Sequence, residues 1–174
     1  LPVQFFYGIF MKFREYLYIK NILSSCKLNS FVISIGNLSM GGCGKTPLVI
    51  YLINELKKRN PEKKICVILR GYKAKNKLDL PVLVNETCTS NDVGDEAVML
   101  YHKLSGLNNV SIIACPDRKG AGERAIEELG AEILILDDAF QHLKIKRDLN
   151  ICLIDCSDEE TLELFPVGNL REGF

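Results

Sequence analysis

The fold is decided by Phe31-Val-Ile-Ser-Ile-Gly36-Asn-Leu-Ser39-Met-Gly41-Gly42-Cys43-Gly44-Lys45-Thr46, an apolar strand, a glycine-rich turn and the start of a helix. Backbone N–H groups in such a turn curl around a phosphate, and the helix N-terminus adds the positive end of its dipole. Ser39 stands where the usual pattern has glycine, and the alternative is a glycine-rich turn without a ligand. We predict phosphate binding, with Lys45 reaching the β- and γ-phosphates and Thr46 binding Mg²⁺, in a loop made of Gly41, Gly42, Cys43, Gly44, Lys45 and Thr46.

Two carboxylates follow another apolar run. Asp137 and Asp138 come directly after Ile133–Leu136, as expected where a buried strand delivers acidic side chains to the edge of a sheet beside bound Mg²⁺. Asp pairs in this position are also common turn formers. Together with the loop upstream, the pair indicates a P-loop nucleotide triphosphatase or kinase. The residues do not decide which carboxylate contacts the metal.

The remaining pattern predicts an α/β fold of the P-loop NTPase type, with a mostly parallel sheet flanked by helices. Apolar, β-branched runs typical of strands buried on both faces alternate with helical spacing. The expected strands are Phe31–Ile35, Ile65–Leu69, Val110–Ala114, Ile133–Leu136 and Ile151–Ile154, with a short one at Val82–Val84. The expected crossover helices are Thr46–Arg59, Asp95–Leu104 and Lys119–Leu129.

Composition narrows the class of protein. The 174 residues, of which 47% are hydrophobic and 25% charged, fit one globular domain. The 22 basic residues balance the 22 acidic ones, which disfavours nucleic acid as a partner. The seven cysteines show no metal-ligand spacing and are interpreted as reduced thiols. Leu1–Met11, the longest uncharged run, is too short to span a bilayer, so neither a membrane span nor an export signal is predicted.

An amphipathic helix is predicted at Phe5–Leu23, where five apolar residues fall on one stripe and basic residues lie elsewhere. Packing against the domain's own core is the commoner fate of such a helix. The alternative is an interfacial helix on an anionic membrane surface. We therefore expect an N-terminal segment over residues 1–30 and a nucleotide-binding lobe over residues 31–174.

The order of motifs resembles the tetraacyldisaccharide 4′-kinase family. The matching segments are Ser34-Ile-Gly-Asn-Leu38, Gly41-Gly-Cys-Gly-Lys-Thr-Pro47, Arg70-Gly-Tyr72, Gly94-Asp-Glu96, Pro116-Asp-Arg118, Asp137-Asp138 with Gln141-His142, and Leu170-Arg-Glu172. The resemblance implies ATP- and Mg²⁺-dependent phosphorylation of the 4′-hydroxyl of a tetraacylated glucosamine disaccharide 1-phosphate. It also implies work at the cytoplasmic face of the bacterial inner membrane, as a peripheral protein. An acylated lipid substrate favours the interfacial interpretation of Phe5–Leu23.

The resemblance also implies residue roles. Asp95 matches the family's general base, and Lys45 is assigned to catalysis with it. Thr46, Asp137 and Asp138 fall in the metal-binding segments. The expected acceptor-site residues are Tyr72, Arg118 and Arg171. Members of this family continue past the Leu-Arg-Glu motif into a second α/β lobe, so two alternatives remain: a P-loop ATPase or GTPase switch, and a truncated, noncatalytic nucleotide-binding fragment.

Overall fold

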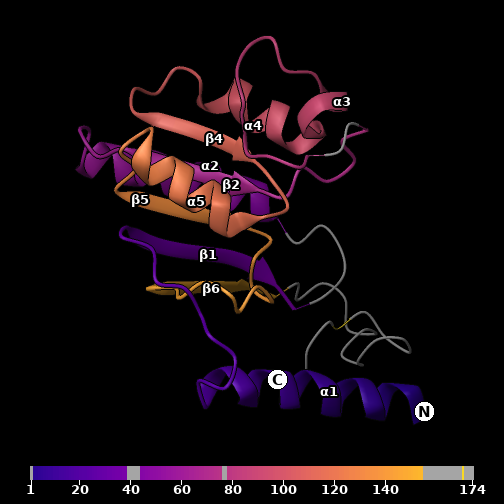
Figure 1. Cartoon of the computed structure of the whole chain (residues 1–174). Helices are drawn as coiled ribbons and strands as arrows, with labels where there is room; N and C mark the ends of the chain where they lie inside the picture. Colours follow the sequence, from indigo (N-terminus) through magenta and orange to yellow (C-terminus); the bar gives the residue numbers. More distant parts are fainter. Residues whose placement is uncertain (1, 39–43, 76–77, 155–169, 171–174) are drawn as a thin grey trace.

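The computed structural model describes residues 2–38, 44–75, 78–154 and 170, and it contains a mostly parallel α/β sheet (Figure 1). The sheet has six strands in the order β3-β4-β2-β5-β1-β6. Only the β3–β4 pair is antiparallel. The strands are β1 (Phe31–Asn37), β2 (Ile65–Leu69), β3 (Val82–Leu83), β4 (Val110–Ala114), β5 (Ile133–Asp137) and β6 (Leu149–Leu153). The predicted fold class is confirmed.

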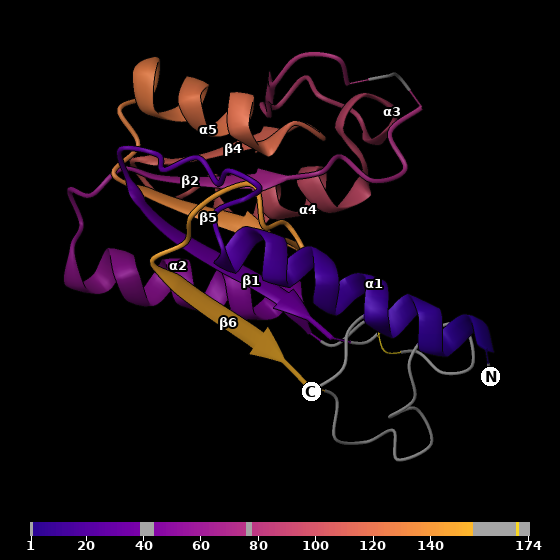
Figure 2. The same ribbon diagram turned by 60° about the horizontal axis from the view of Figure 1, so that its bottom comes forward.

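Helices cover both faces of the sheet. The described residues contain α1 (Pro2–Ile19), α2 (Lys45–Arg59), α3 (Ser90–Val93), α4 (Asp95–Leu104) and α5 (Arg118–Glu127). Figure 2 shows α5 on one face and α2 with α4 on the other. This layering explains the uninterrupted apolar strands, because every residue of β2 is buried and successive side chains enter different cores. Ile65 and Val67 pack on the α2–α4 side, and Cys66 and Ile68 pack on the α5 side.

The element boundaries differ from the prediction mainly at the sheet edge. Strand β6 begins at Leu149 rather than Ile151, because its parallel pairing with β1 starts at Ile33 and Leu149. The short helix α3 was not predicted. It begins with a capping box in which Thr89 and Asp92 satisfy each other's backbone N–H groups.

The two strands that precede the predicted phosphate-binding loop and the acidic pair are neighbours. Ile35 of β1 is in register with Asp137 of β5. The chain after β5 then crosses the end of β1 so closely that a Cβ on Gly36 would lie 2.5 Å from the Phe140 Cβ. A glycine at this position therefore lets the two loops meet at one edge of the sheet.

Helix α1 lies apart from the sheet and its covering helices (Figure 1). It ends at Ile19 instead of Leu23, and Asn21 has a left-handed backbone with φ 54°. Most of its large apolar side chains are exposed: Phe6 is 68% exposed and Phe10 is 61% exposed, while Leu17 is half-buried. No helix among the described residues combines the length and the apolarity needed to cross a bilayer. Membrane association and the division at residue 30 stay predictions.

Candidate functional site: a cleft beside the phosphate-binding motif

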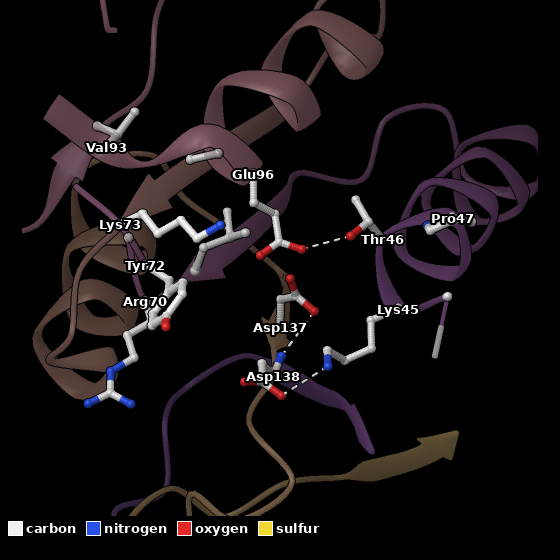
Figure 3. A pocket seen from close by; sticks show the side chains of 14 residues that line it. Lys45, Thr46, Pro47, Arg70, Tyr72, Lys73, Val93, Glu96, Asp137 and Asp138 are labelled. Atoms are coloured by element: carbon white, nitrogen blue, oxygen red, sulfur yellow. Dashed lines mark hydrogen bonds and ion pairs between the residues drawn. The ribbon is translucent and has the colours of Figure 1, made fainter. Parts of the chain in front are cut away.

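A cleft of about 940 Å³ lies where β2, β5 and the N-termini of α2 and α4 meet (Figure 3). The carboxyl ends of parallel strands form ligand sites in open α/β sheets, and this cleft has that position. Its lining residues are Gly44, Lys45, Thr46, Pro47, Leu69, Arg70, Gly71, Tyr72, Lys73, Val93, Glu96, Ala97, Asp137 and Asp138.

Lys45 and Asp138 form the basic and acidic sides of one contact. The Lys45 Nζ lies 3.3 Å from the Asp138 Oδ1, and the Lys45 side chain is only 14% exposed. The same amine donates a hydrogen bond of 2.9 Å to the Asn37 Oδ1 at the end of β1. These contacts hold the Lys45 amine between the ends of β1 and β5. Of that loop, Gly44, Lys45 and Thr46 are described, and the predicted Gly41, Gly42 and Cys43 lie outside the described residues.

Thr46 contacts a residue that the sequence analysis did not assign. Its hydroxyl donates a hydrogen bond of 2.7 Å to the Glu96 Oε1, which lies on the first turn of α4 (Figure 3). Glu96 follows Asp95 directly, and it was quoted with Gly94 as part of a motif without receiving a role. The signal available was the motif itself. What the sequence could not supply is the approach of α4 to α2, because β2, β3 and α3 separate these two helices along the chain.

Asp137 is the buried member of the acidic pair, with 2% of its surface exposed. Burial, followed by the nearby Glu96 carboxylate, raises the pKa of Asp137 to about 7. Its Oδ1 accepts a hydrogen bond of 2.9 Å from the N–H of Asp138. Asp138 itself has a left-handed backbone with φ 46°. The turn therefore directs one carboxylate into the protein and the other toward Lys45.

The donors present fit Mg²⁺. Among the residues that the structure describes, no group of three or more His, Cys, Asp or Glu side chains is close enough together to form a complete metal cage. Mg²⁺ does not require one, since it is usually held by one or two carboxylates together with waters and substrate phosphates. The Thr46 hydroxyl and the Asp137 and Asp138 carboxylates supply such a partial set. Burial and then the nearby Glu96 carboxylate raise the pKa of Asp137, and a bound cation would favour its ionised form.

Of the remaining predicted site residues, some line the cleft and others do not. Tyr72 lines the cleft and is 73% exposed. It lies beside Arg70, which belongs to the same quoted motif, and Lys73, which the sequence analysis did not single out. Asp95 is exposed at the N-terminus of α4 but is absent from the cleft lining. Arg171 lies outside the described residues.

Arg118 is buried beneath the acidic turn, with 5% of its surface exposed. Its Nη2 donates hydrogen bonds of 2.9 Å to the main-chain oxygens of both Asp137 and Asp138. Burial lowers the pKa of Arg118, and attraction to Asp138 works in the opposite direction. The acceptor-site role of Arg118 stays a prediction. The structure shows in addition that its guanidinium is bound to the main chain of the acidic turn.

Known proteins resemble this chain over its whole length. A family model described as tetraacyldisaccharide-1-P 4′-kinase matches residues 1–174. The tetraacyldisaccharide 4′-kinase of Aquifex aeolicus (strain VF5) is 43% identical over 174 residues, covering 99% of this chain and 53% of that protein. The enzyme of that name from Haemophilus influenzae (strain 86-028NP) is 36% identical over 174 residues, covering 98% and 50%.

A solved structure extends the comparison to the fold. The crystal structure of LpxK from Aquifex aeolicus in complex with ATP matches with a TM-score of 0.85 and 42% identity, covering 99% of this chain and 53% of that one. The chain thus spans about half the length of the relatives it matches. Because the family model extends from Leu1 to Phe174 and the solved relative shares the fold, this chain belongs to the tetraacyldisaccharide-1-P 4′-kinase family.

Proposed function

We propose that this chain carries the nucleotide-binding lobe of a kinase that transfers the γ-phosphoryl group of ATP to the 4′-hydroxyl of a tetraacylated glucosamine disaccharide 1-phosphate, a step of lipid A biosynthesis. The observation that carries the proposal is the cleft in which Lys45 and Thr46 face Asp137, Asp138 and Glu96. The solved relative at 42% identity holds ATP, which supports nucleotide binding at this loop.

Each side chain has a role that its contacts support. Lys45, a cation already placed at the loop, would neutralise phosphate oxygens of ATP. Thr46, Asp137 and Asp138 would hold Mg²⁺ through oxygen donors. Bound Mg²⁺ would supply neutralisation of the charge that develops on the transferred phosphoryl group. Glu96 would join this set, because its carboxylate contacts the Thr46 hydroxyl.

The acceptor would enter from the side of the cleft opposite the phosphate-binding loop. Tyr72, Arg70 and Lys73 line that side, and cationic side chains suit a sugar phosphate. Arg171 completes the proposed acceptor set. Asp95 would take the proton of the 4′-hydroxyl as its oxygen forms the new bond to phosphorus and the bond to ADP breaks. An exposed carboxylate at a helix N-terminus is accessible to such a substrate.

The acyl chains of the proposed substrate support a reaction at the membrane surface. Each buried methylene stabilises association with an apolar phase by about 0.8 kcal/mol, so such a lipid stays in a bilayer. The exposed aromatic side chains of α1 are suited to the interface of that bilayer. We propose peripheral binding at the cytoplasmic face of the bacterial inner membrane.

The test is a phosphotransfer assay on the complete protein that contains this chain. With γ-labelled ATP, Mg²⁺ and the acylated disaccharide 1-phosphate, label is expected in the lipid, and ATP consumption is expected to require that lipid. ATP hydrolysis that proceeds equally without acceptor would contradict the proposal and would favour a nucleotide-driven switch.

A further inference from the structure

Arg118 makes contacts that an acceptor-binding residue does not need. It is the first residue of α5, and the side chain is 5% exposed. One of its terminal nitrogens is already shared between two main-chain oxygens, at 2.9 Å each. Its Nε is buried and has no hydrogen-bond partner among the described residues. An arginine dedicated to an external phosphate would instead present its guanidinium to the cleft, and Arg118 is absent from the cleft lining.

The two oxygens that Arg118 binds belong to the peptide groups on either side of Asp138. The oxygen of Asp137 lies in the peptide plane that precedes the Asp138 Cα, and the oxygen of Asp138 lies in the plane that follows it. Because peptide groups are planar, fixing both planes fixes the two backbone angles of the residue between them. Those angles determine where the Asp138 side chain points.

Asp138 requires such fixing. Its φ of 46° is in the left-handed region, where a residue with a Cβ is disfavoured and persists only when its surroundings hold it. In that conformation its carboxylate reaches the Lys45 amine at 3.3 Å. The next N–H, that of Ala139, donates to the main-chain oxygen of Ile35 at 3.2 Å and so ties the turn to β1.

We propose that Arg118 is the positioning residue of the acidic turn, and that it acts on the metal through the backbone of Asp138. Its guanidinium binds both peptide groups that flank Asp138 and thereby holds the Asp138 carboxylate beside the Lys45 amine. The consequence for metal binding rests on the function proposed above. The effect on the turn itself does not.

Arg147 provides a matched comparison within the same segment. Its Nη1 donates to the main-chain oxygens of Ala139 at 3.3 Å and of Phe140 at 2.7 Å. It therefore makes the same kind of contact two residues further along the chain, to oxygens outside the two peptide groups that flank Asp138. If any loss of arginine contacts loosened the site, the two arginines would behave alike. If the proposal is right, they differ.

The first measurement is amide hydrogen exchange on the complete, metal-free protein, in unmodified form and as Arg118→Met, Arg118→Lys and Arg147→Met. Arg118→Met is expected to remove protection at the N–H groups of Asp138 and Ala139 while the buried strand β2 stays protected. Arg118→Lys, which keeps the charge, is expected to restore part of it. Protection of Asp138 and Ala139 that survives in Arg118→Met overturns the proposal. If Arg118→Met loses protection at every amide, including those of β2, the comparison is made with Arg118→Lys instead. Full protection of the Asp138 and Ala139 N–H groups in Arg118→Lys then overturns the proposal.

The second measurement is calorimetric binding of ATP with Mg²⁺ and with a chelator. Loss of a residue that orients a metal ligand costs about 10- to 100-fold in metal affinity. Arg118→Met is therefore expected to reduce the gain that Mg²⁺ gives to ATP affinity by about tenfold, and Arg147→Met to leave that gain unchanged. An unchanged gain in Arg118→Met, with a raised KM for the acceptor lipid, overturns the proposal in favour of an acceptor-site role. If the unmodified protein binds no MgATP, the proposed function fails, and hydrogen exchange still decides the role of Arg118.

Discussion

At the scale of single residues, Lys45 is the side chain on which nucleotide binding depends most directly. A charge-assisted hydrogen bond to phosphate contributes about 1.5–3 kcal/mol. Lys45→Ala is therefore expected to weaken MgATP binding by roughly 10- to 150-fold in calorimetry. Lys58→Ala on the same helix serves as the control, because Lys58 is 71% exposed and pairs with Glu55. Equal affinities for Lys45→Ala and the unmodified protein would refute the P-loop assignment.

Asp95 tests the proposed chemistry separately from binding. Removing a general base typically costs 10²–10⁴-fold, so Asp95→Ala is expected to lower kcat by roughly that factor while leaving ATP affinity intact. The alternative role is a negative charge that complements the helix dipole of α4. Asp95→Glu separates the two, since it keeps that charge but displaces the carboxylate. Normal turnover in Asp95→Glu, together with a mere loss of stability in Asp95→Ala, would favour the helix-dipole role.

Two titratable groups, the buried Asp137 and the half-buried His142, give the metal-free protein opposing pH dependences. Asp137 has a pKa of about 7 when folded and an ordinary value of 3.8, so the folded state retains a proton that the unfolded state has released as the pH rises from about 4 to 7. Stability contributed at Asp137 therefore falls across that window. Burial, then Arg118, lowers the pKa of His142 from 6.5 to about 4, so its contribution falls instead as the pH drops from 6.5 toward 4.

Substitution of Asp137 isolates its contribution to the pH dependence of the free energy of unfolding. Each unit of pKa difference corresponds to about 1.4 kcal/mol, so Asp137→Asn is expected to gain a few kcal/mol over the unmodified protein between pH 5 and pH 8. Urea unfolding in the presence of a chelator measures this difference. His142→Gln is the companion variant, and its relative gain is expected on acidification. A stability difference between Asp137→Asn and the unmodified protein that is the same at both pH values would contradict the buried, proton-retaining state of Asp137.

At the scale of the elements, Gly94 sets how closely α4 approaches the chain after β2. Its φ is 88°, and a Cβ there would lie 2.3 Å from the main-chain oxygen of Tyr72. Such a backbone disfavours any side chain by about 1–3 kcal/mol. Gly94→Ala is expected to lower the free energy of urea unfolding by at least that amount. Gly106→Ala is the control, because a Cβ at Gly106 meets nothing within 4 Å. Equal losses in the two variants would contradict this account.

The packing of α4 against the chain near Tyr72 illustrates which features could be predicted from the sequence and which could not. The buried strands were predictable because two-sided burial leaves long apolar runs, as in β2, and Lys45 and Asp137 were predictable because local motifs mark them. Glu96 was not assigned, since its meeting with Thr46 depends on the path of α4 past Tyr72 and not on any local pattern. The burial of Arg118 was not predicted for the same reason. An arginine that follows a strand has the same sequence pattern whether its side chain faces a ligand or a backbone turn.

At the scale of the whole molecule, α1 is the part that the fold of the sheet does not explain. Its phenylalanines face solvent, and the Arg14 guanidinium donates a hydrogen bond to the main-chain oxygen of Gln141. Burying exposed phenylalanines in a bilayer interface stabilises binding by roughly 1.5–3 kcal/mol each, and basic residues such as Lys12 add attraction to anionic lipid. These terms favour a membrane-facing helix over one left in water.

Vesicle cosedimentation tests this expectation on the complete protein. The unmodified form is expected to bind anionic vesicles more strongly than neutral ones, with part of the binding lost at high salt. Phe10→Asp/Phe13→Asp and deletion of residues 1–23 are expected to abolish most of it, because an aspartate at the interface loses the apolar contact and repels anionic lipid. Tyr51→Asp alters an aromatic residue that is 62% exposed on α2 and is expected to bind normally. If every form binds equally, or none binds, the contact with lipid must be made by a surface other than α1.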